Sequence, residues 1–410
     1  MSVRLLLVFV CGAISGALVN YGIYRLAWKQ RAIGPWGTPH DDASPRNVWD
    51  RIPIVGWLGL RRDVAVHGSG YWLRPLGIEL CLGLGLAALY YFEVQGRGLW
   101  PPVTRGDEAL AIACHAQFLA HALLIVFMTV ATFIDFDEKT IPDAITIPGT
   151  LTGLVFALAL PSSHLPDGLF QRPVPHLLLS LPPWPPWLYQ WTGLVIGWAI
   201  MLAWSLAIME YYWITRFGLR KAYRYMFASI IRYRTWIRPL ILTPAGCALV
   251  TIAWLLGGVH WEAMLTALVG LAFGGGLIWA VRIAGYVALR REAMGFGDVT
   301  LMAMIGSFVG WQPALLIFFL SPFAGAAIAL LQLVLARSRE IAFGPYLCLS
   351  TLVVIVSWDT LWRQTVGQHF VGLGWLLPAM IGILVIVMGF LLFTVRLIER
   401  LLFTGADTEA

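Results

Sequence analysis

The sequence predicts an all-α polytopic membrane protein, a bundle of about nine to eleven transmembrane helices. Of its 410 residues, 59% are hydrophobic and only 12% are charged, which is about half the charged fraction of a typical soluble domain. Apolar runs of about 20 residues, the length that crosses a bilayer, recur along the whole chain. This composition argues against a soluble enzyme, a disordered scaffold and a nucleic-acid-binding protein.

Hydropathy places these spans in order along the chain. The first run resembles a secretory signal, but it continues to Tyr24 and is followed by Arg25, Lys29 and Arg31, so we predict a retained signal-anchor helix. The run at 299–312 is short for a full crossing, which leaves the helix count open. The predicted spans lie near 3–24, 76–93, 109–134, 144–160, 188–213, 239–258, 263–289, 299–312, 314–336, 343–360 and 375–398.

Positive charge predicts how the spans are oriented. The 25–74 connection carries eight Lys or Arg residues and the 214–238 connection carries seven. Because cytoplasmic loops are enriched in Lys and Arg, these two connections are expected to face the cytoplasm. The alternate connections lie at 94–108, 161–187, 259–262 and 361–374, and together they carry only four Lys or Arg residues.

Two connections have unusual compositions. Residues 161–187 are rich in Pro and Trp, which predicts an irregular segment in the headgroup layer of the outer face. Residues 214–238 are cationic and aromatic. They form either a helix that lies on anionic lipid or an anchor that only fixes the orientation of the neighbouring spans.

Two aspartates are the strongest candidates for chemistry, because ionisable residues at the edge of membrane spans are commonly functional. Asp135 closes an apolar run at a cytoplasmic end, and Asp298 follows Gly295 and Gly297 directly before another. Two carboxylates that meet in a low-dielectric site share one proton, as an aspartic peptidase requires. The glycines would let the backbone approach a partner closely.

Structural explanations exist for the same residues. Asp298 is well placed to cap the helix that begins at Val299, and Asp143 to complement the positive end of the 144–160 helix. His115 and His121 lie six positions apart, on different faces of one span, and are expected to pack rather than to act together. The residues alone leave a catalytic pair and a structural pair both open.

The chain resembles the prepilin peptidases, polytopic aspartic peptidases that remove the basic leader of type IV pilin-like precursors. The first aspartate motif is Ile134-Asp135 with Ile141-Pro142-Asp143, and the second is Gly295-Phe296-Gly297-Asp298. Three further motifs follow the family's order: GALVN with IYRL at 16–26, DRIPIVGWL at 50–58 with Pro75 and Glu79, and FGPYL at 343–347.

The resemblance implies that Asp135 and Asp298 are the catalytic pair, supported by Pro142, Asp143, Gly295 and Gly297. It implies a type IV prepilin-like (pseudopilin) precursor as partner, cleaved after a glycine at the cytoplasmic face of a bacterial inner membrane. Membrane lipid is the other expected partner, and no nucleic acid is expected. Peptidase activity of this kind needs no cofactor.

The departures from the family concern its second activity. Many members carry two cysteine pairs in the first loop that bind zinc, and they methylate the new N-terminus of the pilin. Residues 25–74 contain no cysteine, and the five cysteines elsewhere form no CxxC spacing. Zinc is therefore not expected, and S-adenosylmethionine is expected only if methylation is retained.

The motifs divide the chain into five segments. Residues 1–108 form the N-terminal module, 109–160 and 263–398 form the peptidase core, and 399–410 form a polar tail. Residues 161–262 separate the aspartate motifs more widely than the family usually does, and are predicted to be an inserted segment. Three alternatives to a prepilin peptidase stay open: an aspartic peptidase with another substrate, a proton-coupled transporter, and a non-catalytic membrane subunit of a pilus or secretion assembly.

Overall fold

The computed structural model describes residues 3–31, 33–37, 39–102, 108, 110–166, 184–209, 219–289, 294–335 and 342–367, with isolated positions between 376 and 394. All regular elements in these ranges are helices, so the predicted all-α polytopic class is confirmed. Most of the Pro/Trp-rich connection, most of the predicted span at 375–398 and the tail at 399–410 lie outside the described residues.

Six helices in the described part of the chain are long and apolar enough to cross a membrane, or seven if the bent pair formed by α13 and the turn after it counts as one span. Three further apolar helices are shorter, namely α6 (Asp143–Ala159), α7 (Trp191–Ala207) and α11 (Phe296–Val309). The six helices that are long enough to cross are α1 (Val3–Leu26), α4 (Leu73–Tyr90, continued by a π-helical turn to Gln95), α5 (Leu110–Glu138), α9 (Ile237–Leu256), α10 (Gly258–Leu289) and α12 (Trp311–Leu335).

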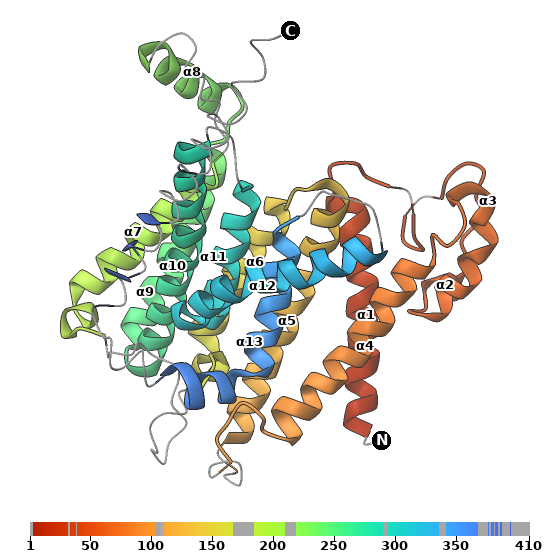
Figure 1. Ribbon diagram of the computed structural model, residues 1–410, viewed down its shortest axis with the longest axis horizontal. Helices are drawn as coiled ribbons and strands as arrows, with labels where there is room; N and C mark the ends of the chain where they lie inside the picture. Colours follow the sequence, from red (N-terminus) through yellow and green to blue (C-terminus); the bar gives the residue numbers. More distant parts are fainter. Residues whose placement is uncertain are drawn as a thin grey trace.

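The remaining helical elements include α13, the first loop and the helix that follows α7. The predicted span at 343–360 corresponds to α13 (Gly344–Val356), and the chain then bends by 82° into the helical turn Thr360–Val366, within the predicted connection at 361–374. The short helices α2 (Val55–Leu60) and α3 (Val64–His67) lie in the first loop, and α8 (Leu219–Arg232) lies beyond one end of the bundle. In Figure 1, α1 and α4 form one side, α7 and α9 the other, and α5, α6, α11 and α13 lie between them.

Helix α11 is the central element of the core. It has 14 residues and is therefore about 21 Å long, too short to cross a typical bilayer core of about 30 Å by itself. Every residue from Asp298 to Val309 is buried, because α11 is apolar on all sides and contacts α5, α6, α10, α12 and α13. The helix that carries Asp298 is therefore held by protein from all directions.

Two hydrophobic clusters meet at α11. The larger one joins residues of α1, α4, α5, α11, α12 and α13. The smaller one joins residues of α6, α7, α9 and α10 with Ala303 of α11. Residues 161–262, the predicted insertion, thus contribute α7 and α9 to the second cluster, and they also supply α8.

The closest helix crossing joins α10 to α11 through two glycines. A Cβ atom at Gly270 would lie 2.0 Å from the Gly306 carbonyl oxygen, and one at Gly306 would lie 2.1 Å from the Gly270 carbonyl oxygen. Backbones approach this closely only where neither residue has a side chain, as in other membrane helix pairs with small residues at the interface.

Gly270→Ala is therefore expected to destabilise the fold by about 1–3 kcal/mol, because the added methyl group must push two backbones apart. Gly276→Ala, on the same helix, is the matched control, since a Cβ there would meet nothing within 4 Å. Thermal unfolding of both purified variants in detergent measures the difference. Equal losses of stability in the two variants would show that the crossing tolerates a side chain.

Candidate active site

The structure brings Asp135 and Asp298 together. Asp135 lies three residues before the end of α5, and Asp298 is the third residue of α11. Both helix ends lie at the same end of the bundle, opposite the N-terminus (Figure 1). The two residues are 5% and 7% exposed, and the motifs that carry them pack against each other where Ile141 meets Gly297. The burial and the shared environment of this pair are the features that acid-base chemistry requires.

A third element, α13, positions Asp135. The backbone N–H of Gly344, the first residue of α13, donates a hydrogen bond of 3.2 Å to Oδ2 of Asp135. Pro345 follows directly and has no N–H, so Gly344 supplies the donor at the positive end of this helix. A Cβ atom at Gly344 would lie 2.7 Å from the same Oδ2 and 2.9 Å from Cδ1 of Ile141. Only glycine leaves room here for the carboxylate.

The two glycines of the second motif differ in what they contact. A Cβ atom at Gly297 would lie 2.9 Å from Cβ of Ile141, so this glycine allows the first motif to pack directly against the second. Gly295 caps α11 with extended backbone, and a Cβ there would meet nothing nearer than Oδ2 of Asp298 at 3.6 Å. Close approach thus explains Gly297 but not Gly295.

Pro142 and Asp143 begin α6 beside the first aspartate motif. Pro142 is the N-cap residue, and its carbonyl oxygen accepts a hydrogen bond of 3.0 Å from the Ile145 N–H. Asp143 is the first residue of the helix and forms an ion pair of 3.4 Å with Arg238, at the start of α9. An ion pair therefore connects Asp143 to the cationic connection at 214–238, while Pro142 marks the start of α6.

Cys348 is a neighbour of the aspartate pair that the sequence did not single out. It is 5% exposed, lies one turn after Gly344, and its Sγ is 3.8 Å from the carbonyl oxygen of Met128 on α5. Gly344 belongs to the FGPYL motif at 343–347 and Cys348 follows it directly, but only the fold brings this segment close to Asp135.

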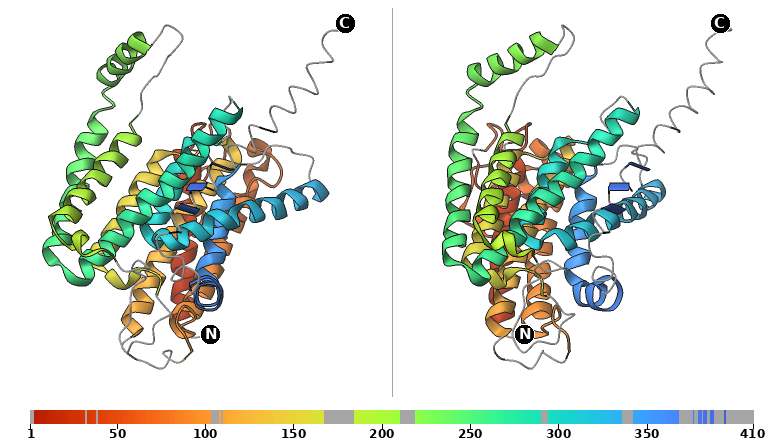
Figure 2. Two further views of the ribbon diagram at one scale, coloured as in Figure 1. Left: turned by 60° about the vertical axis from the view of Figure 1, so that its left-hand side comes forward. Right: turned by 90° about the vertical axis from the view of Figure 1, so that its left-hand side faces the viewer.

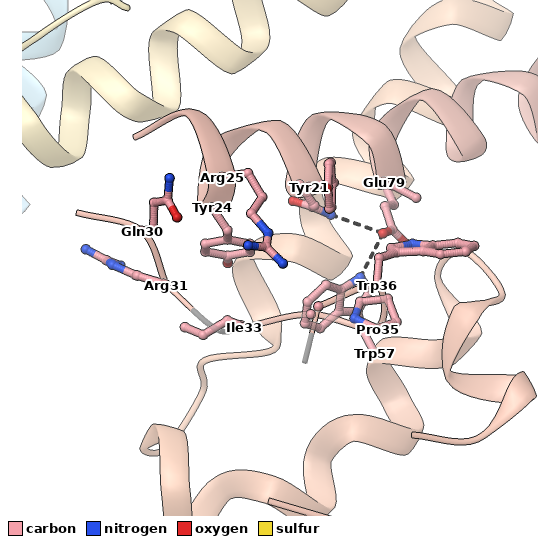
Figure 3. Close-up of a pocket in the computed structure, with 14 residues that line it drawn as sticks. Tyr21, Tyr24, Arg25, Gln30, Arg31, Ile33, Pro35, Trp36, Trp57 and Glu79 are labelled. Atoms are coloured by element: carbon pink, nitrogen blue, oxygen red, sulfur yellow. Dashed lines mark hydrogen bonds between the residues drawn. The ribbon is translucent and has the colours of Figure 1, made fainter. Parts of the chain in front are cut away.

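The N-terminal motifs of the resemblance meet at Glu79, which is 1% exposed. Its carboxylate accepts hydrogen bonds from Nδ2 of Asn20 at 3.1 Å and Nε1 of Trp57 at 2.7 Å (Figure 3). It also accepts one from the backbone N–H of Ile54. Glu79 lines a cavity of about 250 Å³, whose other lining side chains include aromatic and basic ones. They include Tyr21, Tyr24, Arg25, Arg31 and Trp36.

Ion pairs hold the first loop together. Arg46 pairs with Asp63, and both side chains are almost fully buried. The guanidinium of Arg62 donates to both carboxylate oxygens of Asp50, one of the bonds at 2.9 Å. Across the described ranges, no group of three or more His, Cys, Asp or Glu side chains is arranged to hold a metal ion.

The Asp50–Arg62 pair makes the stability of the loop depend on pH. The hydrogen bond from Arg62 lowers the pKa of Asp50 below its usual value. The stabilisation is therefore fully present above the unfolded-state pKa of about 4, and is lost as the pH falls through the lower folded-state value. Asp50→Asn is expected to cost about 2 kcal/mol at neutral pH and to remove this acid-dependent part. The free energy of unfolding in detergent, measured from neutral to acid pH for the wild type and the variant, checks both the loss of stability and its dependence on pH. If the stability of Asp50→Asn fell with acid as that of the wild type does, Asp50 would be excluded as the source of the acid dependence.

Comparison with known proteins finds relatives for the segments that carry the two aspartates. The model of the type IV leader peptidase family matches residues 122–211 and 226–330. The matched segments contain both aspartates and the glycines before Asp298, run through α7 and α9, and leave out residues 212–225. No solved structure matches the chain.

Several curated proteins named prepilin leader peptidase/N-methyltransferase are similar to parts of the chain. The protein of Aeromonas hydrophila is 32% identical over 27% of this chain and 38% of its own length. The Escherichia coli protein is 29% identical over 30% of this chain and 56% of its own length. The Pseudomonas aeruginosa protein is 34% identical over 24% of this chain and 34% of its own length. The chain thus spans about a third to just over half of the length of these relatives. Together, the family match and these similarities support the type IV leader peptidase family as the family of this chain.

Proposed function

We propose that the protein is an aspartic endopeptidase that removes the basic leader of type IV prepilin-like precursors, with Asp135 and Asp298 as its catalytic pair. The observation that carries the proposal is that two buried carboxylates, from the end of α5 and the start of α11, lie at the same end of the bundle although 163 positions separate them in the sequence (Figure 1). Its support is the family match and the names of the relatives.

The chemistry needs both carboxyl groups in different protonation states. Like-charge repulsion in a buried site disfavours double ionisation, so the pair shares one proton near neutral pH. The ionised carboxylate takes a proton from water, which attacks the peptide carbonyl, while the protonated carboxyl donates its proton to the carbonyl oxygen. Collapse of the tetrahedral intermediate then breaks the C–N bond, and a proton passes to the leaving amine.

The position of the pair suits a precursor with a basic leader and an apolar helix. Asp135 and Asp298 lie at the end of the bundle that carries the basic first loop and α8, which we assign to the cytoplasmic face of the inner membrane. The precursor helix remains in lipid while its leader reaches the aspartates. Cleavage after a glycine places a residue without a side chain at the reacting carbonyl.

The direct test is co-expression with type IV prepilin-like precursors, followed by mass spectrometry of the precursor. We expect the mass to fall by that of the leader with the wild-type chain and to stay unchanged with an empty vector. Intact precursors in the presence of correctly inserted wild-type protein would contradict the proposal. Solute uptake without proteolysis would favour a proton-coupled transporter instead.

Methylation of the new N-terminus is a second candidate activity, favoured by the cavity above Glu79. A buried carboxylate beside the rings of Tyr24, Trp36 and Trp57 fits a sulfonium cation, so these residues would hold S-adenosylmethionine, which supplies the methyl group. The same mass spectrum tests this, because a methylated product is heavier by one methyl group. Loss of that increment in Glu79→Gln, with cleavage retained, is the expected result, whereas an unmethylated product from the wild type would exclude it.

A further inference from the structure

Helix α8 carries a dense positive charge with no acidic residue nearby in the chain. Residues 211–261 contain no Asp or Glu, whereas 219–238 contain six Lys or Arg. Figures 1 and 2 show α8 beyond the end of the bundle at which α5 ends and α11 begins, opposite the N-terminus. The charge therefore lies on the side of the molecule that holds the aspartate pair.

The exposed side of α8 is both apolar and cationic. Tyr223, Phe227 and Ile231 are spaced four residues apart and form one stripe, with exposed fractions of 53%, 59% and 70%. Arg220 and Arg224 precede Tyr223 and Phe227 by three positions and lie along the same side of the helix. Large apolar side chains beside cations are the pattern of helices that lie in the interface of a membrane.

The other face of α8 carries small side chains. Ala222 and Ser229, seven positions apart on that face, are 0% and 8% exposed. The exposed large apolar side chains of Tyr223, Phe227 and Ile231 therefore lie away from this face. A contiguous apolar surface of this kind marks an interaction site, and its flanking cations require an anionic partner.

We propose that the exposed face of α8 binds anionic phospholipid on the cytoplasmic leaflet. In this arrangement the stripe formed by Tyr223, Phe227 and Ile231 enters the acyl boundary, and Arg220, Lys221 and Arg224 contact the lipid phosphates. The basic segment also reaches the peptidase core, because Arg238 at the start of α9 pairs with Asp143 at the start of α6. Lipid binding at α8 does not depend on the proposed peptidase activity.

The test measures lipid affinity directly on the purified full-length chain in detergent. An environment-sensitive fluorophore on Ile231→Cys reports binding of short-chain phosphatidylglycerol, with phosphatidylcholine of equal chain length for comparison. Cys11, Cys81 and Cys247 are replaced by alanine, and Cys114 and Cys348 are buried, so the fluorophore has one accessible site. We expect tighter binding of phosphatidylglycerol, and a loss of roughly fivefold in affinity for each cation removed from Arg220, Lys221 and Arg224 by substitution with Gln.

A matched variant separates this surface from general basicity. Lys29→Gln/Arg51→Gln/Arg61→Gln removes the same charge from exposed positions of the first loop, and is expected to leave the affinity unchanged. Tyr223→Ser/Phe227→Ser is expected to weaken binding while the preference for phosphatidylglycerol remains. Equal binding of the two lipids, unchanged affinity in the α8 triple variant, or competition by inorganic phosphate at the lipid's own concentration would overturn the proposal.

Discussion

Asp135→Asn and Asp298→Asn are each expected to lower the rate of precursor cleavage by about 10²–10⁴-fold. Asparagine keeps the size of the side chain but can neither take a proton from water nor donate one to the substrate as a carboxyl group does. Both positions are buried, but asparagine has nearly the same volume as aspartate, so the variants are expected to insert and fold. Initial rates of precursor cleavage in detergent micelles, at equal enzyme concentration, measure the effect.

Asp143→Asn is the control for this prediction. Asp143 belongs to the same motif, but in the structure it pairs with Arg238 and its side chain is 29% exposed. Its substitution is expected to change the cleavage rate much less than that of either buried aspartate. A variant of Asp135 or Asp298 that cleaves as fast as Asp143→Asn would remove that residue from the catalytic pair.

Gly344→Ala is expected to lower the cleavage rate by about 10–100-fold with little change in precursor affinity. The new Cβ would lie 2.7 Å from Oδ2 of Asp135, so the carboxylate must move or lose its hydrogen bond to the residue 344 N–H. Displacements of about 1 Å at a reacting group cost rates of this order. A KM that stays constant while kcat falls is the expected kinetic signature.

Gly295→Ala provides the comparison. Its Cβ would lie 3.6 Å from Oδ2 of Asp298, an ordinary van der Waals distance, so the carboxylate can keep its place. The cleavage rate of this variant is expected to stay close to that of the wild type. If Gly295→Ala lost as much activity as Gly344→Ala, glycine in the second motif would be required for a reason other than room around Asp298.

The fold class and most spans followed from apolar runs, since a bilayer permits few alternatives to helices. The direction of the chain after α13 was not predictable in this way. Hydropathy ends the span at 343–360 and assigns 361–374 to a connection, whereas the structure bends the chain by 82° into the helical turn Thr360–Val366. Composition records how apolar a segment is, but not the direction in which packing turns it.

The placement of Asp135 and Asp298 at the same end of the bundle was predictable, because the charged connections and the motifs around each aspartate can be recognised from neighbouring residues in the sequence. The groups around the two aspartates were not, because they come from helices whose register is set by packing. Gly344 reaches Asp135 across 209 positions, and Cys348 follows from the same helix turn. Likewise, Glu79 was noticed only as part of a motif, while its three hydrogen bonds to α1 and the first loop depend on how α1 and α4 pack.

The most direct test of the central claim, that the two aspartates act as one unit, is a double-mutant cycle. Single-turnover cleavage would be measured for the wild type, Asp135→Asn, Asp298→Asn and the double variant. Residues that act together lose nearly all their contribution when either is removed. We therefore expect the double variant to cleave at the same residual rate as each single variant. Losses that multiply in the double variant would mean that Asp135 and Asp298 act independently and would contradict the shared site.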